Sequence, residues 1–262
     1  MNEKRAPEVS VVIPLYNEER RLAGNYEKIT AYLAAKHPAC EIILVDDKST
    51  DRTIAVARGL MRRHGEERLL ALGCHLGKGG AVREGMLRAR GAYIVFMDAD
   101  LSTPIEELAK FEPLMRSGAD VMIGSRKKEG ARIMRRQPRL REFLGKMFTR
   151  LGNALVAPGI SDFTCGFKGF SARAARKIFS HQRITDWSFD AEILFLAQRF
   201  RYPIHEIPVL WRNERGSKVR VLRDVCVSLL GLLRIKTYDF LGAYRTPLKG
   251  GASREITLYD GL

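Results

Sequence analysis

Two carboxylates one residue apart, Asp98 and Asp100, directly follow a run of five apolar residues at positions 93–97. A short run that is rich in β-branched and aromatic residues predicts a strand buried on both faces. Two negative charges at a buried strand end repel each other and lose hydration, so a positive group is expected between them. A hard divalent cation suits this place because it binds carboxylate oxygens and leaves coordination positions for substrate phosphates. The alternative is that one of the two aspartates only caps a turn.

The residues after this acidic pair predict a helix. Positions 103–106 read Thr-Pro-Ile-Glu, which is the pattern of a capping box with proline at the first helical position. The predicted order is therefore strand, acidic pair and helix. In open parallel α/β sheets, ligands bind at the carboxyl ends of the strands. The acidic pair is thus expected at the ligand-binding edge of such a sheet.

Hydrophobic patterns along the first half of the chain alternate between strands and helices. Strands are predicted at 9–14, 41–45, 69–72, 93–97 and 121–124. The helices between them are predicted at 19–36, from a cap at Ser49 or Thr50 to before Gly65, and from about 77 to 90. This alternation is typical of βαβ units around a parallel sheet. Because polar residues repeatedly follow the strands, we interpret this part as a nucleotide-binding half-sheet.

The glycine-rich segment at 77–80, Gly-Lys-Gly-Gly, lacks the spacing and the Ser or Thr of a P-loop. The first strand is not followed by the Gly-x-Gly-x-x-Gly pattern of dinucleotide-binding enzymes. Neither an ATPase nor a dinucleotide-dependent dehydrogenase fits. Asp46 and Asp47, which follow the second strand, can instead accept hydrogen bonds from a base or a ribose. The alternative is that one of them caps the following helix.

The net charge of +15 is concentrated in two segments, because residues 126–150 carry +8 and residues 212–236 carry +5. Such clusters indicate an anionic partner, namely phosphate, nucleic acid or a lipid head group, unless they form a solvated basic face. A nucleic-acid-binding protein is disfavoured because the clusters lack interleaved aromatic residues. The acidic pair would also repel a nucleic-acid backbone.

The chain shows no N-terminal signal, and no apolar run approaches the roughly 20 residues of a membrane-spanning helix. Its four cysteines are far apart, which favours free thiols in a reducing compartment. A cytoplasmic protein is therefore expected.

Several segments, taken together, resemble family 2 glycosyltransferases with a GT-A fold. They read Val-Ile-Pro-Leu-Tyr-Asn-Glu (12–18), Val-Asp-Asp-x-Ser-x-Asp (45–51), Gly-Lys-Gly (77–79) and Asp-Ala-Asp (98–100). Residues 162–170, 187–192 and 216–219, with Trp211, resemble the dolichyl-phosphate β-glucosyltransferase subgroup and its bacterial polyprenyl-phosphate relatives. The resemblance covers about residues 8–236. It implies an α/β fold of the GT-A type, a mostly parallel Rossmann-like sheet flanked by helices.

The resemblance also implies an activity. A hexose, in the first place glucose from UDP-glucose, would be transferred with inversion to a polyprenyl or dolichyl phosphate, assisted by Mg²⁺ or Mn²⁺. The alternative is a soluble family 2 transferase with a small hydroxyl acceptor. Asp100 would be the metal ligand, with Asp98 as a second ligand that faces the sugar or ribose. Asp98 and Asp190 are the expected catalytic residues.

The remaining site residues follow from their positions in the same motifs. Pro14, Tyr16, Asn17 and Glu18 would border the nucleoside, Asp46 and Asp47 would contact the base or ribose, and Lys78 would lie near the base or phosphates. Arg126, Arg215 and Lys218 would face the diphosphate from the side opposite the metal, where a planar guanidinium suits bidentate contact with phosphate.

The acceptor determines what Asp190 must do. A sugar hydroxyl needs a general base during attack, whereas a phosphate monoester, with a second pKa of about 6, is already largely dianionic. With a polyprenyl phosphate, Asp190 is expected to orient or screen rather than to abstract a proton. The alternative for Asp190 is a role at the N-cap or in the first turn of its helix. The nearby Cys165 is expected to be a buried packing residue.

The sequence predicts three parts. Residues 1–125 form the nucleotide-binding half and 126–218 the acceptor half of one glycosyltransferase domain, in which a strand at 204–210 precedes a basic loop. Residues 219–262 hold an amphipathic helix, to about 236, and a tail. That helix is too short in its apolar part to span a bilayer. The helix would either lie in a membrane interface or pack on the domain as a core helix. For the protein as a whole, peripheral contact with the cytoplasmic face of a membrane is expected.

Overall fold

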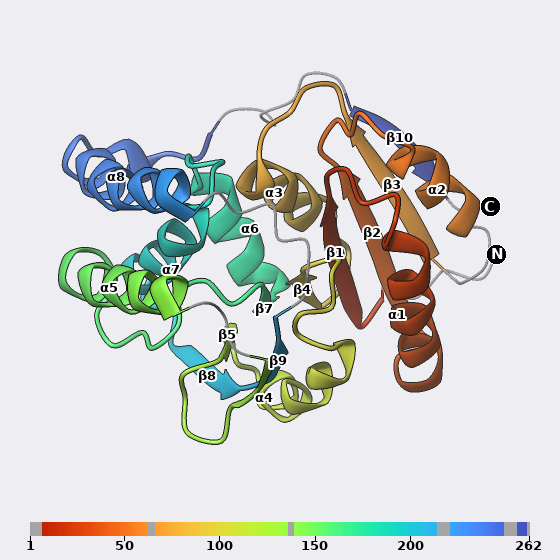
Figure 1. Ribbon diagram of the computed structural model, residues 1–262, viewed down its shortest axis with the longest axis horizontal. Coiled ribbons are helices and arrows are strands. Elements are labelled where there is room, and N and C mark those ends of the chain that lie inside the picture. Colours follow the sequence, from red (N-terminus) through yellow and green to blue (C-terminus); the bar gives the residue numbers. More distant parts are fainter. Residues whose placement is uncertain (1–6, 62–65, 136–138, 214–220, 249–255, 261–262) are drawn as a thin grey trace.

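The computed structural model describes residues 7–61, 66–135, 139–213, 221–248 and 256–260. A central sheet of eight strands runs in the order β10-β3-β2-β1-β4-β7-β5-β8 (Figure 1). These strands are β1 Val9–Leu15, β2 Cys40–Asp46, β3 Glu66–Leu72, β4 Tyr93–Met97, β5 Val121–Ser125, β7 Phe167–Ser171, β8 Ile204–Pro208 and β10 Ile256–Asp260. Two short strands, β6 Arg132–Arg135 and β9 Leu210–Arg212, pair in parallel as a separate sheet.

The central sheet is mainly parallel, as predicted. Strands β3, β2, β1 and β4 pair in parallel, and so do β5 and β8. Strand β7 is antiparallel to both of its neighbours, β4 and β5, and β10 is antiparallel to β3 at one edge. Because β7 runs the opposite way, its first residues lie at the edge where the parallel strands end. The loop that leads into β7 therefore arrives at the ligand-binding edge.

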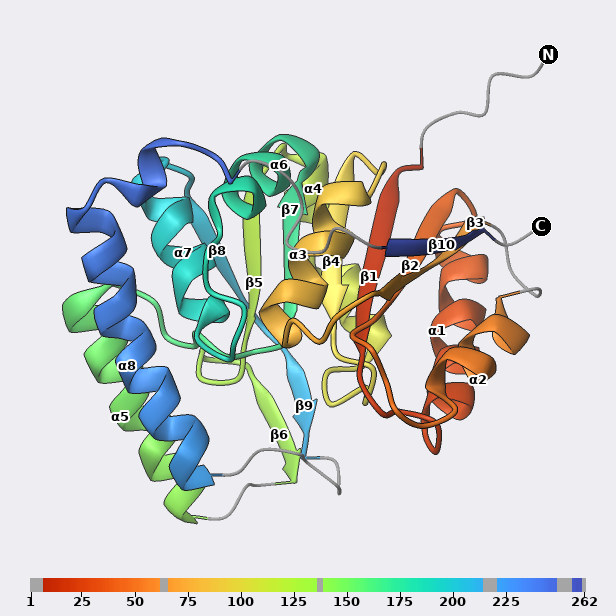
Figure 2. The same cartoon turned by 90° about the horizontal axis from the view of Figure 1, so that it is seen from above.

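Helices cover both faces of the sheet (Figure 2). They are α1 Leu22–Lys36, α2 Thr53–Leu60, α3 Lys78–Arg88, α4 Glu112–Arg116, α5 Arg139–Leu155, α6 Ala172–His181, α7 Phe189–Arg199 and α8 Val221–Phe240, with the 3₁₀ segments η1 Ile105–Lys110 and η2 Ala243–Arg245. Alternating strand residues point to opposite faces. Val12 packs in the core beneath α3, α6 and α7, whereas Val11 and Ile13 pack in the core beneath α1 and α2. The predicted fold class is thus confirmed.

Two predicted helix starts are wrong. Pro104 has an extended backbone and precedes a 3₁₀ helix, and no side chain caps that segment. The hydroxyl of Thr103 instead lies 3.8 Å from Cys165 Sγ. Neither Ser49 nor Thr50 caps α2, whose N-cap position is Arg52. These polar residues bind the neighbouring loop rather than the helix, so their local pattern was misleading.

Other differences concern elements that the sequence pattern did not reveal. Strand β7 was not predicted, because Lys168 interrupts its apolar run. The predicted strand at 204–210 is divided into β8 and the start of β9. No strand was predicted in the tail, yet residues 256–260 form β10 against the edge strand β3. Among the described residues, none of the helices combines the length and apolar character that crossing a bilayer requires.

Candidate active site

The acidic pair lies at the carboxyl end of β4, as predicted. The N–H of Asp98 donates to the carbonyl oxygen of Gly166 over 3.2 Å, which ties the pair to the loop before β7. A Cβ atom at position 166 would lie 2.0 Å from Asp98 Oδ2, so only glycine leaves room for this carboxylate. The lead-in to β7 therefore forms one wall around the acidic pair.

A lysine supplies part of the positive charge that the two carboxylates need. Lys78 Nζ lies 2.6 Å from Asp98 Oδ1 and 5.5 Å from the centroid of the Trp187 ring. Burial lowers the pKa of Lys78, but the carboxylates of Asp98, Asp190 and Asp100 raise it and outweigh burial. Lys78 thus lies in the combined field of three carboxylates from two sides of the site.

Asp100 is the member of the pair without a lysine partner among the described contacts. Its Oδ1 accepts the Ser102 N–H over 2.9 Å. Burial, followed by the charge of Asp98, raises the pKa of Asp100. Within the described part of the chain, no cluster of three or more acidic, histidine or cysteine side chains forms a metal site. Because Asp98 is paired with Lys78, Asp100 is the carboxylate of the pair without a cationic lysine partner among the described contacts.

Asp47 fixes the loop that carries Lys78. Its two carboxylate oxygens accept the Leu76 N–H over 2.7 Å and the Gly77 N–H over 2.9 Å. His75 Nδ1 lies 2.8 Å from Asp47 Oδ2. Burial raises the pKa of Asp47 despite these contacts. The role at the base edge that the resemblance implied for Asp47 stays a prediction, because these oxygens already hold the loop.

Asp46 is fully buried and keeps one oxygen available. Its Oδ2 accepts the Ser49 N–H over 2.9 Å, while its Oδ1 has no hydrogen-bond partner in the described structure. Burial raises the pKa of Asp46. A buried acceptor without a donor is unfavourable. Asp46 Oδ1 is therefore a buried acceptor whose donor is missing among the described residues.

Of the residues predicted to border the nucleoside, Pro14 lies in β1, where it pairs with Val45 of β2. Tyr16, Asn17 and Glu18 follow the strand. The Tyr16 ring lies 4.5 Å, centroid to centroid, from the His75 ring at a 32° tilt. Asn17 has a φ of 53°, and its N–H donates to Ser49 Oγ over 2.9 Å. These contacts join the loop after β1 to the loops after β2 and β3.

Glu18 also follows β1, but its backbone and its side chain are bonded to other residues of the protein. Its N–H donates to Thr53 Oγ1 over 2.7 Å, and its Oε1 accepts from Arg21 Nη2 over 2.8 Å. Glu18 is buried and acts in the structure as a link between α1 and α2. Its contact with a nucleoside remains a prediction.

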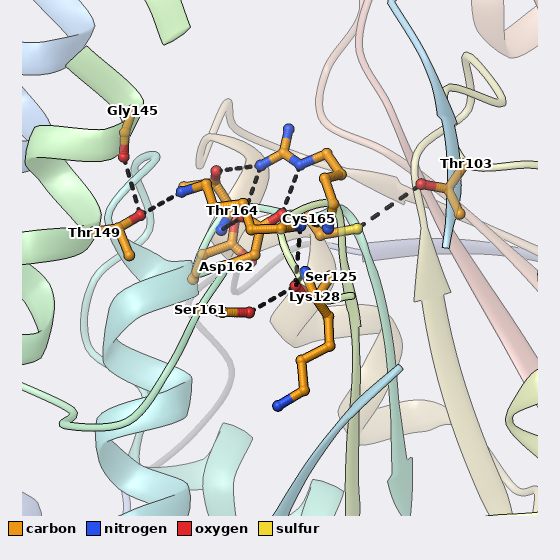
Figure 3. Close-up of polar contacts among 12 residues, drawn as sticks. Thr103, Ser125, Lys128, Gly145, Thr149, Ser161, Asp162, Thr164 and Cys165 are labelled. Atoms are coloured by element: carbon orange, nitrogen blue, oxygen red, sulfur yellow. Dashed lines mark hydrogen bonds and ion pairs between the residues drawn. The ribbon is translucent and has the colours of Figure 1, made fainter. Parts of the chain in front are cut away.

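The guanidinium of Arg126 is held by the buried Asp162, which Figure 3 labels together with Thr164. Its Nε and Nη2 donate to Asp162 over 2.7 and 2.8 Å, and Nη2 also donates to Thr164 Oγ1 over 2.7 Å. The Trp211 ring centroid lies 5.3 Å from the guanidinium carbon. Burial raises the pKa of Asp162, but Arg126 and Lys127 more than reverse this and lower it well below its usual range. Arg126 is thus fixed in place before any phosphate arrives.

Asp190 lies in the first turn of α7, but Ser188 and not Asp190 is the N-cap residue. Its Oδ1 forms an ion pair with Lys168 Nζ, and both side chains are buried. The same Nζ donates to the Cys165 carbonyl oxygen over 2.7 Å. Cys165 is itself buried, and burial raises the pKa of its thiol to about 11, so it is a packing residue as predicted.

The structure brings most predicted site residues to one edge of the sheet. Those at the ends of β1, β2 and β4 gather near Lys78, Arg126 follows β5 on the far side of β7, and Asp190 pairs with Lys168 of β7 itself. Arg215 and Lys218 lie outside the described residues. Sequence reasoning gave no role to Asp162, Lys168, Gly166 or His75. The one available signal was a lysine within the otherwise apolar run 167–170.

Comparisons with known proteins agree with this arrangement. The sequence pattern described as Glycosyl transferase family 2 matches residues 10–179. The chain is 37% identical over 225 residues to the dolichyl-phosphate β-glucosyltransferase of Drosophila melanogaster, covering 81% of this chain and 69% of that protein. It is 36% identical over 251 residues to the enzyme of the same name from Homo sapiens, covering 91% of this chain and 78% of that protein.

A solved structure shows the same fold. It is glucosyl-3-phosphoglycerate synthase from Mycobacterium tuberculosis, in complex with Mn²⁺, UDP-glucose and phosphoglyceric acid, which superposes with a TM-score of 0.64. The sequences are 18% identical, and the superposition covers 93% of this chain and 82% of that chain. At this identity the likeness shows the fold alone. The chain belongs to glycosyltransferase family 2, as a GT-A enzyme of the subgroup that includes the dolichyl-phosphate β-glucosyltransferases.

Proposed function

We propose that this glycosyltransferase moves glucose from UDP-glucose to a polyprenyl phosphate such as dolichyl phosphate, with inversion at the anomeric carbon. The observation that carries the proposal is the ion pair between Asp190 and the buried Lys168. A carboxylate that is already matched by a lysine is a poor general base, because protonating it would leave a buried ammonium unpaired. A phosphate acceptor needs no base, since it is largely dianionic at neutral pH. The names of the similar proteins support the same acceptor.

The donor would bind on the side of β1, β2 and β4. Asp46 Oδ1, the buried acceptor without a partner, would take a hydrogen bond from the nucleoside. Tyr16 and His75 present adjacent rings at the same edge. Lys78 would contact the donor phosphates from its position beside Asp98.

Asp100 and Asp98 would hold Mg²⁺ or Mn²⁺. They fit such a cation because they are two adjacent carboxylates with hard oxygen atoms, and because Asp100 has a raised pKa that a cation would relieve. When bound, the cation neutralises charge that develops on the leaving diphosphate. Arg126 would bind phosphate from the other side, since its guanidinium is oriented by Asp162 and Thr164. Arg215 and Lys218 are proposed as further phosphate contacts.

The acceptor lipid requires access to a membrane, and α5 and α8 offer a surface for it. The two helices pack side by side at one end of the molecule (Figures 1 and 2). Most of the large apolar side chains that the described structure leaves exposed lie on these helices and beside them: Ile133, Met134, Leu140, Phe143, Leu151, Leu155, Leu230, Leu233, Phe240 and Leu241. Exposed cations lie among them, including Arg132, Arg135, Lys146, Arg150 and Lys236.

Helix α8 packs on the domain, and we propose that its exposed side also contacts the membrane. Leu232 and Ile235 are buried, so one side of α8 packs on the domain. Leu230 and Leu233 are 60% and 56% exposed on another side. An apolar face bordered by lysine and arginine suits peripheral binding at an anionic bilayer surface. We propose the cytoplasmic face, because the free thiols of Cys40, Cys74 and Cys165 fit a reducing compartment.

The function is tested by following radiolabelled glucose. The full chain is incubated with labelled UDP-glucose, a polyprenyl phosphate and Mg²⁺ or Mn²⁺, and the products are partitioned between organic and aqueous phases. We expect label in the organic phase only when the lipid phosphate is present, and little label from GDP-mannose. Label that enters an aqueous product with a small hydroxyl acceptor, and not the lipid, would establish the alternative acceptor class.

Membrane contact is tested by flotation with vesicles that contain phosphatidylserine. The Phe143→Glu/Leu233→Glu double variant is expected to float several-fold less than the wild type, because both changes place a negative charge on the apolar face of α5 and α8. Leu258→Glu is the matched control, since Leu258 is exposed on β10 at a distance from these helices. Equal flotation of all three proteins would exclude this surface as the contact.

A further inference from the structure

Lys168 is a lysine without any exposed surface in the middle of the central sheet. It is the second residue of β7, where it pairs with Phe96 of β4 on one side and Ile123 of β5 on the other. Lysine is almost never fully buried unless it is paired, because removing an ammonium from water costs several kcal/mol. An apolar residue would match the other buried residues of this strand, Phe167 and Phe170. The presence of lysine therefore indicates a specific partner.

The contacts of Lys168 connect parts of the site that are distant in sequence. Its Nζ forms an ion pair with Asp190 Oδ1 from α7 and donates to the Cys165 carbonyl oxygen over 2.7 Å. It also lies 5.4 Å from the centroid of the Phe96 ring, on the strand that leads into the acidic pair. These partners come from three separate elements. Asp190 is accordingly held by a cation that is fixed on its other sides by a carbonyl and an aromatic ring.

The charge of Asp190 matters for an anionic acceptor. A buried carboxylate at the acceptor side would repel a phosphate dianion if it had no counter-charge. Lys168 supplies that counter-charge from inside the protein. Arg126 is bound to its own carboxylate, Asp162, and does not have to neutralise Asp190. Each of the two buried carboxylates on this side is thus bonded directly to one cation, Asp190 to Lys168 and Asp162 to Arg126, and Lys78 adds to the positive field at Asp190.

We infer that Lys168 is a positioning residue for glycosyl transfer: it aims the Asp190 carboxylate and cancels its charge where the acceptor phosphate approaches. This inference rests on the proposed function, because it assumes a phosphate acceptor on the Asp190 side. Lys168 itself touches neither the donor nor the acceptor. Its effect on transfer is therefore expected to act entirely through Asp190.

The test is a double-mutant cycle with Lys168→Met, Asp190→Asn and the combined variant, measured with polyprenyl phosphate and UDP-glucose below the melting temperature of every protein. Each single variant is expected to lose about ten- to a hundredfold in kcat/KM for the acceptor, as for the loss of an oriented polar group. The combined variant is expected to lie within about threefold of the weaker single variant. KM for UDP-glucose is expected to change less than about threefold in all three.

A matched control removes a buried ion pair elsewhere. Glu41 is buried at the start of β2, on the edge opposite the site, where it binds Arg68 and Arg90. Glu41→Gln is expected to lower the melting temperature while leaving kcat/KM unchanged. Losses that multiply in the combined Lys168 and Asp190 variant, or an unchanged kcat/KM in Lys168→Met, would overturn the inference.

Melting curves separate this inference from the proposed function. Lys168→Met is expected to lower the melting temperature much more in the wild type than in the Asp190→Asn background, because only the former retains an unpaired buried carboxylate. If the wild type transferred nothing to the lipid phosphate, the proposed function would fail. Independently of the acceptor, equal drops in the melting temperature in both backgrounds would overturn the inferred pairing of Lys168 with Asp190.

Discussion

The carboxylates of the donor side and those of the acceptor side are held by different kinds of partner. Asp46 and Asp47, at the end of β2, accept hydrogen bonds mainly from backbone N–H groups, and burial raises their pKa values. Asp162, before β7, and Asp190, in α7, form ion pairs with Arg126 and Lys168. In the proposed function, the first arrangement would shape the loops around the nucleoside. The second would keep the carboxylates near Arg126 and Lys168 from repelling an incoming phosphate.

Asp98 lies between these two arrangements. Its backbone binds Gly166 of the lead-in to β7, and its side chain is paired with Lys78 of the donor side. Asp100 has no such lysine and is the carboxylate left for a cation. We therefore propose the metal site at the boundary between a side organised by backbone donors and a side organised by cations.

The largest effect is expected from Asp100→Asn, which removes the carboxylate assigned to the cation. We expect transfer to fall by roughly 10³-fold, about 4 kcal/mol, because charge on the leaving diphosphate is no longer neutralised. Steady-state rates of label transfer with excess Mn²⁺ measure this. Chelation of the metal from the wild type should produce a comparable loss. Wild-type activity of Asp100→Asn, or full activity of the wild type after chelation of the metal, would contradict the assignment.

The contrast between the two sides should also appear in stability. Asp162→Asn leaves Arg126 without its charged partner and is expected to reduce the free energy of unfolding by about 3–5 kcal/mol. Asp47→Asn keeps one carbonyl oxygen as an acceptor and is expected to cost about 1–3 kcal/mol. Chemical denaturation at neutral pH measures both. A larger loss for Asp47→Asn than for Asp162→Asn would reverse the comparison.

The pH dependence of that stability difference has a defined sign. Because Arg126 lowers the pKa of Asp162, the contribution of Asp162 is complete above the ordinary carboxyl pKa of about 3.9 and is lost as the pH falls. The gap between wild type and Asp162→Asn should therefore narrow below about pH 4. Burial raises the pKa of Asp47, so its protonated form contributes to the stability of the folded state at low pH. This contribution is lost as the pH rises through the folded-state pKa.

The positions of the carboxylates at the ends of β2 and β4 were predictable from sequence, whereas the ion pairs of Arg126 and Asp190 were not. Asp98 and Asp100 follow a continuous apolar run, and Asp46 and Asp47 follow another, so strand periodicity alone placed them at one edge. The pair Arg126 and Asp162 is formed across 36 positions and the pair Lys168 and Asp190 across 22, with no periodic signal. Strand β7, which brings both pairs together, was hidden because its lysine breaks the apolar pattern.

Local patterns also misled where a tertiary contact decided the structure. Residues 103–106 match a capping box, yet Thr103 contacts Cys165 and Pro104 remains extended. The tail offered no strong pattern, but the edge of β3 has unpaired backbone groups that β10 binds. In each case a contact between distant segments, which sequence periodicity does not encode, determined the outcome.

The most direct test of the account is the rate of Asp190→Asn with the metal, UDP-glucose and polyprenyl phosphate all saturating. If Asp190 only orients or screens an acceptor that is already ionised, the transfer rate should fall by about ten- to a hundredfold. This loss is at or below the low end for a general base. The radiolabel assay measures this loss against the wild type under identical conditions. A loss beyond about 10⁴-fold, the upper end for general-base catalysis, would contradict the central claim that the acceptor needs no base.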